Sequence, residues 1–398
     1  MTDPLGQSQV IPYLEGLTKY GYRFTILSCE KPEKYTLHKE EIESLLENKP
    51  INWVPVKYHK NPAALSTVYD VYQLKKKSKK LHTKEKFDLV HTRAGIPALV
   101  GLWLKKKYGI KFINDIREFY SDSRIEGGMW NTDKFLYKKI YLFFKQKEKE
   151  EFILSDGIVC LTKAAENIIR NSPDYKNEIP LHVIPCSVDT QLFDPGKIDN
   201  LQRIKLKDEL KIKVEDFIFC YLGSVGSWYL TNEMMQFFKI ISDKIPNAKF
   251  LFITPADNKT IIAIANKFRL SENKLIIKKA NRNEVPALLS LSRYSVFFIK
   301  PCYSKQSSSP TKHGEIMAMG IPVITNSGVG DVAEIVEKYH SGIVLNELNP
   351  SKFEYAADLI HGTNNFDRNE IRKGAKEFYN LDNAIEKYRE IYNQVLAK

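Results

Sequence analysis

The sequence predicts an α/β protein with two doubly wound, Rossmann-like domains, and three observations lead to this fold class. Its 398 residues suit two domains of ordinary size. Hydrophobic residues make up 43% and charged residues 27%, which is typical of globular chains. Short apolar runs rich in β-branched and aromatic residues alternate with longer amphipathic stretches, as in repeated βαβ units around parallel sheets.

The expected strands form two series separated by a stretch without strand pattern. The first covers residues 23–28, 52–56, 89–91, 111–115, 157–161 and 182–184, and the second covers 217–222, 249–253, 274–277, 295–299, 323–325 and 342–345. Between them lies the charged segment 194–215. We therefore expect an N-terminal domain over 1–195 and a C-terminal domain over 205–381, facing each other across a cleft. Residues 382–398 have a helical apolar face that we expect to pack back on the first domain.

Charge and cysteine usage narrow the function classes. Lys and Arg number 60 against 48 Asp and Glu, a net charge of +12 that fits a partner such as nucleic acid, an acidic membrane surface or a phosphorylated substrate.

The longest apolar run, 96–104, is too short to span a membrane, and no signal peptide is recognised, so we expect a cytoplasmic protein. The five cysteines are odd in number and scattered without a Cys-x-x-Cys pair, so the sequence supports neither a disulfide framework nor a zinc site: Cys29, Cys160, Cys186, Cys220 and Cys302.

The segment 309–324 carries the strongest local signal. Ser309 is expected to cap a helix that begins at Pro310 and ends before a strand, at Gly320 and Pro322. This helix follows the loop after an expected strand. Its N-terminus offers main-chain N–H groups and a partial positive charge, which suit a phosphate.

Lys312 and Glu315 are three residues apart, so both project from one face of this helix. A cation beside phosphates and a carboxylate that accepts two hydroxyl hydrogen bonds would hold a nucleoside diphosphate. The alternative is an exposed Lys–Glu pair, but the cap, the proline and the loop position favour a site. In the loop 223–226, Gly223 and Ser224 suit a close approach of phosphate to the main chain, with a plain turn as the equal alternative. Trp228 and Tyr229 could stack on a ring or fill the core.

The chain resembles the GT-B glycosyltransferases of family four over nearly its whole length. The resemblance rests on 309–324, the loop 328–331, the segment 183–190 with Phe193 and Pro195, and the opening 3–9. It implies retaining transfer of a sugar from a nucleotide-sugar donor in the C-terminal domain to a glycan or lipid-linked acceptor in cell-surface polysaccharide synthesis. It also implies that Glu315 holds the ribose.

Two features of the C-terminal domain depart from the family pattern. Ser307 stands where the family usually has a glutamate that contacts the donor sugar, and the usual basic pair is absent from 223–229. We infer that the diphosphate is carried by Lys312 with the main-chain N–H groups around Gly223 and Ser224. Ser309 and Thr311, at the start of the helix, complete the expected donor-binding set.

The opening Gly6-Gln7-Ser8-Gln9 precedes an expected helix, and Gly6 and Gln7 are expected at the donor sugar. In the family this loop follows a first strand in the middle of the N-terminal sheet. Met1 is only five residues before Gly6, so we expect that strand to be missing from this sequence. The sheet is then expected to be poorly satisfied, with impaired stability or activity.

His91, Asp115 and Arg117 lie at the carboxyl ends of expected strands and are the catalytic candidates. Arg117 could stabilise the departing diphosphate or the acceptor, although relatives commonly have histidine at this position. Asp115 could orient the acceptor hydroxyl. The alternatives are a structural ion pair of Asp115 with Arg117 or Arg124, and a buried, hydrogen-bonded His91.

The resemblance suggests front-face substitution, in which the leaving phosphate helps deprotonate the acceptor. Since the sequence has no Asp-x-Asp motif, we expect neither a metal nor a cofactor, with positive charge supplied by Lys312 and the helix N-terminus. Three segments are rich in lysine: 75–80, 105–107 and 135–154, the last of which also contains several phenylalanines. Their lysines either lie in water at helix ends or make a weak contact with the anionic inner face of a membrane.

Three other functions are compatible with parts of the sequence. A nucleotide-sugar epimerase of similar fold would convert the donor without an acceptor. A catalytically weak scaffold that binds a nucleotide sugar fits the departures at Ser307 and Arg117. Nucleic-acid binding is suggested only by the charge, because no finger spacing, ribonucleoprotein aromatic motif or basic helical array supports it.

Overall fold

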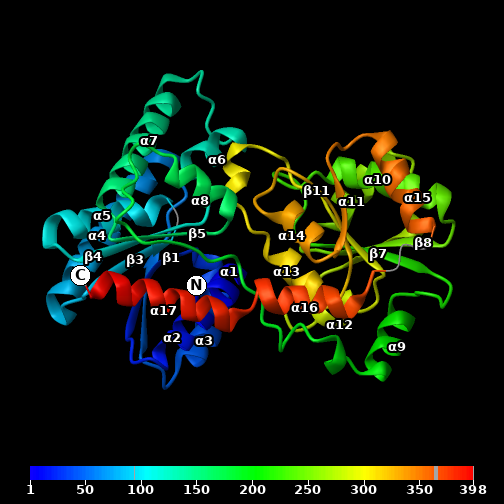
Figure 1. The fold of residues 1–398 in the computed structure, drawn as a ribbon, viewed down its shortest axis with the longest axis horizontal. Helices are drawn as coiled ribbons and strands as arrows, with labels where there is room; N and C mark the ends of the chain where they lie inside the picture. The colour runs from blue at the N-terminus through cyan, green and yellow to red at the C-terminus, as the bar shows by residue number, and fades with distance from the viewer. Residues whose placement is uncertain (94, 363–365, 398) are drawn as a thin grey trace. The chain divides into compact units, whose positions relative to one another are not determined.

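The computed structural model describes residues 1–93, 95–362 and 366–397, which form two compact α/β units (Figure 1). Unit 1 comprises Met1–Ser187 and Leu381–Lys398, and unit 2 comprises Val188–Asn380. All strand pairs in both units are parallel, and each of the strands expected from the sequence corresponds to a strand of the structure. The predicted fold class, an α/β protein with parallel sheets, is therefore confirmed.

Unit 1 contains two separate parallel sheets. One has two strands, β1 (Phe24–Glu30) and β2 (Ile51–Lys57), and the other has four in the order β3-β4-β5-β6. The strands of the second sheet are β3 (Leu89–Arg93), β4 (Lys111–Ile116), β5 (Gly157–Cys160) and β6 (Leu181–Val183). The helices of unit 1 are α1 (Pro4–Gln9), α2 (Ile11–Thr18), α3 (Pro32–Leu46), α4 (Ala63–Glu85), α5 (Gly95–Tyr108), α6 (Tyr120–Glu126), α7 (Phe135–Leu154), α8 (Lys163–Arg170) and α17 (Leu381–Leu396).

The last helix, α17, packs on unit 1 through the apolar face that its periodicity predicts. Its buried side chains share a core with Tyr13 and Leu17 of α2 and with Ile113 of β4. Gly16 lets the helices approach closely, because a Cβ there would lie 2.2 Å from Cδ1 of Ile385. The buried residues of α17 are Ala384, Ile385, Tyr388, Ile391, Tyr392 and Val395.

Unit 2 has one continuous sheet in the order β12-β11-β10-β7-β8-β9, so its first strand in sequence lies in the middle. The strands are β7 (Phe217–Leu222), β8 (Ala248–Ile253), β9 (Leu275–Lys278), β10 (Tyr294–Phe297), β11 (Val323–Asn326) and β12 (Gly342–Leu345). The helices are α9 (Asn200–Glu209), α10 (Thr231–Lys244), α11 (Asn258–Lys267), α12 (Val285–Leu289), α13 (Thr311–Ala318), α14 (Val332–Lys338), α15 (Pro350–His361) and α16 (Arg368–Phe378), with short 3₁₀ turns η1 (Pro195–Lys197), η2 (Glu272–Lys274) and η3 (Tyr303–Ser307).

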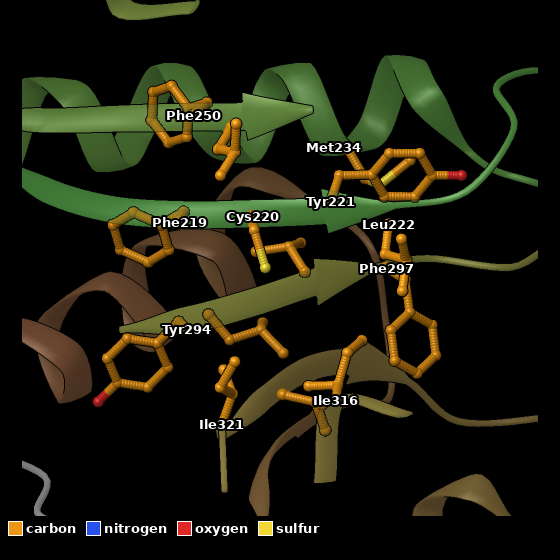
Figure 2. Close-up of a cluster of buried hydrophobic side chains, with 14 of the residues drawn as sticks. Phe219, Cys220, Tyr221, Leu222, Met234, Phe250, Tyr294, Phe297, Ile316 and Ile321 are labelled. Carbon is orange, nitrogen blue, oxygen red and sulfur yellow. The ribbon is translucent and has the colours of Figure 1, made fainter. Parts of the chain in front are cut away.

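Aromatic side chains dominate the core of unit 2. Phe219 and Phe250 on neighbouring strands pack with ring centroids 5.8 Å apart, and Tyr294 stacks on Phe219 at the same distance. Figure 2 shows these rings in one cluster with Ile316 of α13, which lies near Phe297, and with Ile321, which follows that helix and lies near Tyr294. Helix α13 is thus held against the sheet by buried apolar side chains in its second half and just after its end.

The division between the units falls earlier than the segment 194–215 in which we expected it. Residues after Ser187 already pack within unit 2, where Phe193 is fully buried. The Arg372 guanidinium donates to the Phe193 carbonyl at 2.7 Å and lies 3.0 Å from the Asp194 carboxylate. These contacts attach residues 193 and 194 to unit 2. No helix of the described residues has both the length and the apolar character needed to cross a membrane.

Candidate functional site

Lys312 lies buried in the first turn of α13, with only 7% of its surface exposed. Its Nζ is 3.7 Å from the ring centroid of Tyr229 and 4.6 Å from that of Tyr221, so the ammonium lies over two aromatic rings. It also donates to the Tyr221 hydroxyl at 3.4 Å. The nearest carboxylate along the helix, Glu315, is paired with another cation. The Lys312 ammonium is therefore shielded from water without a close anion.

The start of α13 differs from the prediction by one residue. The helix begins at Thr311, and Pro310 rather than Ser309 is the N-cap residue. Pro310 keeps an extended ψ of 115°, so it belongs outside the helix, and its side chain has no group that could cap the first turn. The expectation that Ser309 caps the helix is wrong. Ser309 and Thr311 are both half-buried at this helix start.

The end of strand β7 meets the first turn of α13. Gly223 follows β7 with φ +125°, and a Cβ at this position would lie 2.6 Å from Nζ of Lys312. A larger residue would therefore displace the ammonium as well as strain the backbone. Ser224 is exposed, and its carbonyl accepts a hydrogen bond from the Tyr221 hydroxyl. The structure therefore brings together Lys312, Gly223 and Ser224, which the sequence predicted to lie at one site.

Burial changes the protonation of this lysine. Removal from water lowers the pKa of Lys312 to about 7, and the Glu315 carboxylate offsets only part of the effect. Near neutral pH a large fraction of molecules therefore carries a neutral amine at this position. A phosphate beside Nζ would raise that pKa again, because an adjacent anion favours the ammonium.

Glu315 lies one turn further along α13 and is also only 7% exposed. Its Oε1 accepts a hydrogen bond of 2.8 Å from Nη1 of Arg282. The Arg282 guanidinium also lies 5.3 Å from the ring centroid of Phe193. Sequence reasoning missed Arg282, although the loop after β9 was a usable signal, because ligands of parallel sheets gather at the carboxyl ends of strands.

Three residues close in sequence to Lys312 or Gly223 make contacts with other parts of unit 2: His313, Ser307 and Trp228. His313 is fully buried, with Nδ1 2.9 Å from the Tyr379 hydroxyl, and burial lowers the pKa of His313 to about 3. Ser307 is fully buried and donates to the Ser304 carbonyl at 2.8 Å. Trp228, which the sequence left between stacking and core, is half-buried, with Nζ of Lys305 3.7 Å from its ring centroid.

In unit 1 the catalytic candidates gather around the carboxylate of Asp115, which is fully buried. Its Oδ1 lies 3.2 Å from Nη1 of Arg117, and its Oδ2 accepts from the Tyr388 hydroxyl at 2.9 Å. His91 Nε2 and Arg93 Nε lie 3.4 and 3.5 Å from the same Oδ2. Burial by itself would raise the pKa of Asp115, but Arg117, His91 and Arg93 hold that pKa well below its usual range.

Of the two ion pairs considered for Asp115, the structure contains the one with Arg117. The alternative pair with Arg124 is wrong, because the Arg124 guanidinium binds Glu118 at 3.0 Å. His91 also fits the structural alternative in part, since its Nδ1 lies 2.7 Å from the Tyr392 hydroxyl. Arg117 reaches the sulfur of Cys186 at 3.4 Å with its other Nη. The cluster joins β3 and β4 to α17.

The opening of the chain is helical rather than a loop. Gly6 and Gln7 lie inside α1, and a Cβ on Gly6 would come within 2.5 Å of the Met1 carbonyl oxygen. Gln9, the last residue of α1, is buried and donates from Nε2 to the Ser187 carbonyl at 2.9 Å. The carbonyl of Gln9 in turn accepts from the guanidinium of Arg93.

Two protein-family models match the chain and together cover most of it. The model described as "Glycosyltransferase Family 4" matches residues 9–192, and the model described as "Glycosyl transferases group 1" matches residues 202–378. Among curated proteins, the chain is 20% identical over 324 residues to a UDP-Gal:alpha-D-GlcNAc-diphosphoundecaprenol alpha-1,3-galactosyltransferase of Escherichia coli. That match covers 79% of this chain and 77% of the relative.

Several solved structures share the fold at low sequence identity. A glycosyltransferase from Rickettsia africae is 16% identical with a TM-score of 0.69, and the match covers 99% of this chain and 96% of that one. Anabaena HepE in complex with UDP is 12% identical with a TM-score of 0.69, covering 98% and 97%. Sucrose-phosphate synthase from Thermosynechococcus elongatus is 14% identical with a TM-score of 0.68, covering 94% and 99%.

Proposed function

Since the chain is a GT-B glycosyltransferase of family four that uses a nucleotide sugar, we propose that it transfers a hexosyl or related residue from a UDP-sugar with retention of configuration. The acceptor in this proposal is a glycan or lipid-linked saccharide of cell-surface polysaccharide synthesis. The E. coli relative, whose name specifies a UDP-galactose donor and a lipid-diphosphate acceptor, supports this direction. The UDP complex of HepE supports the choice of nucleotide.

One observation carries the donor site: the buried Lys312 ammonium beside Gly223, with Glu315 one turn along the same helix. In the proposal the diphosphate lies against Nζ of Lys312 and the main-chain N–H groups at Gly223 and Ser224. Ser309 and Thr311 line its edge at the helix start. The ribose hydroxyls donate to Glu315, whose other oxygen is already oriented by Arg282.

The positive charge of Lys312 and the α13 N-terminus is also proposed to stabilise the leaving group of the reaction. When the bond between the anomeric carbon and the phosphate oxygen breaks, negative charge grows on the diphosphate, and Lys312 and the helix N-terminus stabilise it without a metal or cofactor. The departing phosphate oxygen accepts the proton of the acceptor hydroxyl, whose oxygen bonds to the anomeric carbon from the same face. No enzyme nucleophile is needed in this scheme.

Unit 1 is proposed to supply the acceptor side. Asp115 has its carboxylate occupied by neighbouring side chains, which fits a positioning residue for Arg117 and His91. Arg117 and His91 keep 13% and 17% of their side chains exposed, unlike the fully buried Asp115, so of the three catalytic candidates these two are proposed to meet substrate. Gly6 and Gln7 are proposed near the donor sugar.

Helix α7 is proposed to contact the anionic inner face of the membrane that carries the acceptor. Its exposed apolar side chains lie among lysines, and Nζ of Lys139 is 4.4 Å from the Phe135 ring centroid. Sedimentation with anionic liposomes at low salt tests this contact, and failure to bind there would remove it. The exposed apolar residues of α7 are Phe135, Leu136, Leu142, Phe143 and Ile153.

The deciding experiment is a thermal-shift panel with UDP-, GDP- and ADP-sugars on the parent chain, Lys312→Ala and Glu315→Ala. We expect UDP-sugars to stabilise the parent and to lose most of this effect in both variants. If no nucleotide sugar shifts the parent, or if both variants respond like it, the proposed donor site is wrong. Product analysis then distinguishes transfer from epimerisation, because an epimerase changes the donor without any acceptor.

A further inference from the structure

Three arginines of unit 2 gather at the amino ends of the neighbouring strands β7 and β10. Arg293 immediately precedes β10, and its guanidinium lies 5.3 Å from the ring centroid of Phe217, the first residue of β7. Its N–H donates to the Ile218 carbonyl of β7 at 2.8 Å. Arg203 lies near the start of α9, and Arg368 is the first residue of α16. Since β7 has six residues, its amino end lies about 20 Å from the donor site that follows its carboxyl end.

The turn between α12 and β10 brings these side chains together. It follows α12, which contacts α9, and it ends at Arg293. Nη2 of Arg203 donates to the Ser290 carbonyl in this turn at 3.4 Å, and Nη2 of Arg368 donates to the Ser292 carbonyl at 3.2 Å. Two of the guanidinium groups are therefore bound to the turn that carries the third. Arg203, Arg293 and Arg368 thus form one arginine cluster.

The arginine cluster has no acidic partner. In the described part of the chain, none of its three guanidinium groups forms an ion pair with a carboxylate. Other arginines of unit 2 do form such pairs, since Arg282 binds Glu315 and Arg372 binds Asp194. The positive charge of the cluster is therefore not balanced by the side chains that surround it.

The acidic residues that precede α9 and α16 are already used as helix caps. Asp199 accepts a hydrogen bond from the Leu201 N–H at the start of α9. Asp367 accepts from the N–H groups of Asn369 and Glu370 at the start of α16. Because both carboxylates are directed to their own helices, they do not pair with the arginines.

Without an anion, the arginine cluster is electrostatically unfavourable. Burial and the positive charges of Arg293 and Arg203 lower the pKa of Arg368. Arg203 and Arg368 also lie at the beginning of their helices, where the helix dipole is positive and cations are disfavoured. An anion bound among the three guanidinium groups would remove both penalties.

We propose that Arg203, Arg293 and Arg368 form a binding site for a phosphate group that carries a double negative charge. Guanidinium groups donate paired hydrogen bonds to phosphate oxygens. Only one N–H of Arg203 and one N–H of Arg368 are used by the described residues, so the remaining donors of the cluster are available. The site lies at the edge of the unit 2 sheet opposite the donor site, and the proposal is independent of glycosyl transfer.

The phosphate group can belong to two kinds of molecule. One is a free phosphate or a small phosphorylated compound. The other is a lipid headgroup, which fits the exposed apolar side chains of Leu201 and Ile204 on α9, next to Arg203. The phosphate chemistry is the same in both cases, and the experiment separates the two sources.

The first arm of the test measures binding of inorganic phosphate to the full chain by calorimetry and by the melting temperature, with sodium chloride holding the ionic strength constant. Arg293→Gln should raise the dissociation constant at least about tenfold, because a charged hydrogen bond is lost. Arg293 is exposed and its side chain donates no hydrogen bond to the described chain, so this variant should fold like the parent. The matched control is Arg269→Gln, whose arginine is also exposed and makes no ion pair in the described chain.

The Lys312→Ala variant separates this site from the donor site. If phosphate binds at the arginine cluster, Lys312→Ala should keep its response to phosphate, and Arg293→Gln should lose most of it. A phosphate response that is lost in Lys312→Ala and unchanged in Arg293→Gln would overturn the proposal, because the anion would then bind at the donor site alone.

The second arm measures cosedimentation with phosphatidylcholine vesicles that contain phosphatidic acid, whose headgroup is a phosphate monoester. It compares Arg203→Gln/Arg293→Gln with Lys259→Gln/Arg269→Gln, a control of equal net charge altered at exposed positions. A tenfold weaker vesicle affinity in the first variant alone supports the site and identifies a lipid headgroup. Equal vesicle binding, with the response to inorganic phosphate lost only in the first variant, supports it and identifies a free phosphate. If the two variants behave alike in both arms, the proposal is wrong.

Discussion

The replacement of Lys312 by methionine should make the protein more stable and at the same time unable to hold its donor. Methionine keeps most of the apolar stem and removes the charge. The pKa of Lys312 falls from 10.5 to about 7 on folding, which corresponds to about 5 kcal/mol against the ammonium well below pH 7. The Tyr221 and Tyr229 rings return about 1–2 kcal/mol each. We therefore expect a net gain of about 2 kcal/mol for Lys312→Met at pH 6.

The stability difference between Lys312→Met and the parent should depend on pH. The folded chain has the lower pKa, so the unfolded chain binds more protons between pH 7 and 10.5, and the stability of the parent rises over this window. The advantage of Lys312→Met should therefore be largest below pH 7 and fade toward pH 10.5. UDP-sugar affinity, measured by calorimetry, should fall at least 100-fold, or about 2.7 kcal/mol.

Urea unfolding at pH 6 and pH 9.5 measures the stability change, with Lys259→Met as the matched control. Lys259 is exposed on α11, so its replacement should change the free energy of unfolding by no more than about 0.5 kcal/mol at either pH. The reasoning is refuted if Lys312→Met is less stable than the parent at pH 6, or if it binds UDP-sugars with unchanged affinity.

The remaining predictions concern protons and the two carboxylates. At pH 8 the parent should take up close to one proton when UDP binds, because the phosphate raises the pKa of Lys312 from about 7. Calorimetry in buffers of different ionisation enthalpy measures this proton uptake. If no proton is taken up, the phosphate does not bind beside Lys312. Glu315→Gln should weaken UDP-sugar binding about tenfold while the melting temperature shifts little, and an unchanged dissociation constant would contradict the ribose assignment. Asp115→Asn should cost about 3 kcal/mol of stability near pH 7, because it leaves Arg117 buried without its anion. The pKa of Asp115 is lower in the folded chain than its unfolded value of 3.8, so the ionised carboxylate stabilises the fold above pH 3.8 and this stabilisation is lost as the pH falls below it. The stability of Asp115→Asn should therefore fall less than that of the parent on acidification. Acid unfolding curves of the same shape for both proteins would refute the assignment.

Much of the donor site was accessible from the sequence because its signals are local. Pro310, Gly320 and Pro322 bound a short helix by their own backbone preferences, and spacing alone places Lys312 and Glu315 on one face. The exact cap was predicted one residue too early, because Pro310 can occupy either the cap or the first turn. Arg282 was missed because its contact with Glu315 joins positions 33 residues apart in the sequence.

Local preferences of single residues, summed along the chain, determined the class of fold, the series of strands and the helix that carries the donor-binding pair. Only the tertiary structure decided that the Lys312 ammonium lies over the rings of Tyr221 and Tyr229, and that the Asp115 carboxylate also meets Arg93 and the Tyr388 hydroxyl. These features arise from contacts between distant segments. Desolvation and strand pairing depend on which atoms surround a group, and no spacing along the chain encodes that environment.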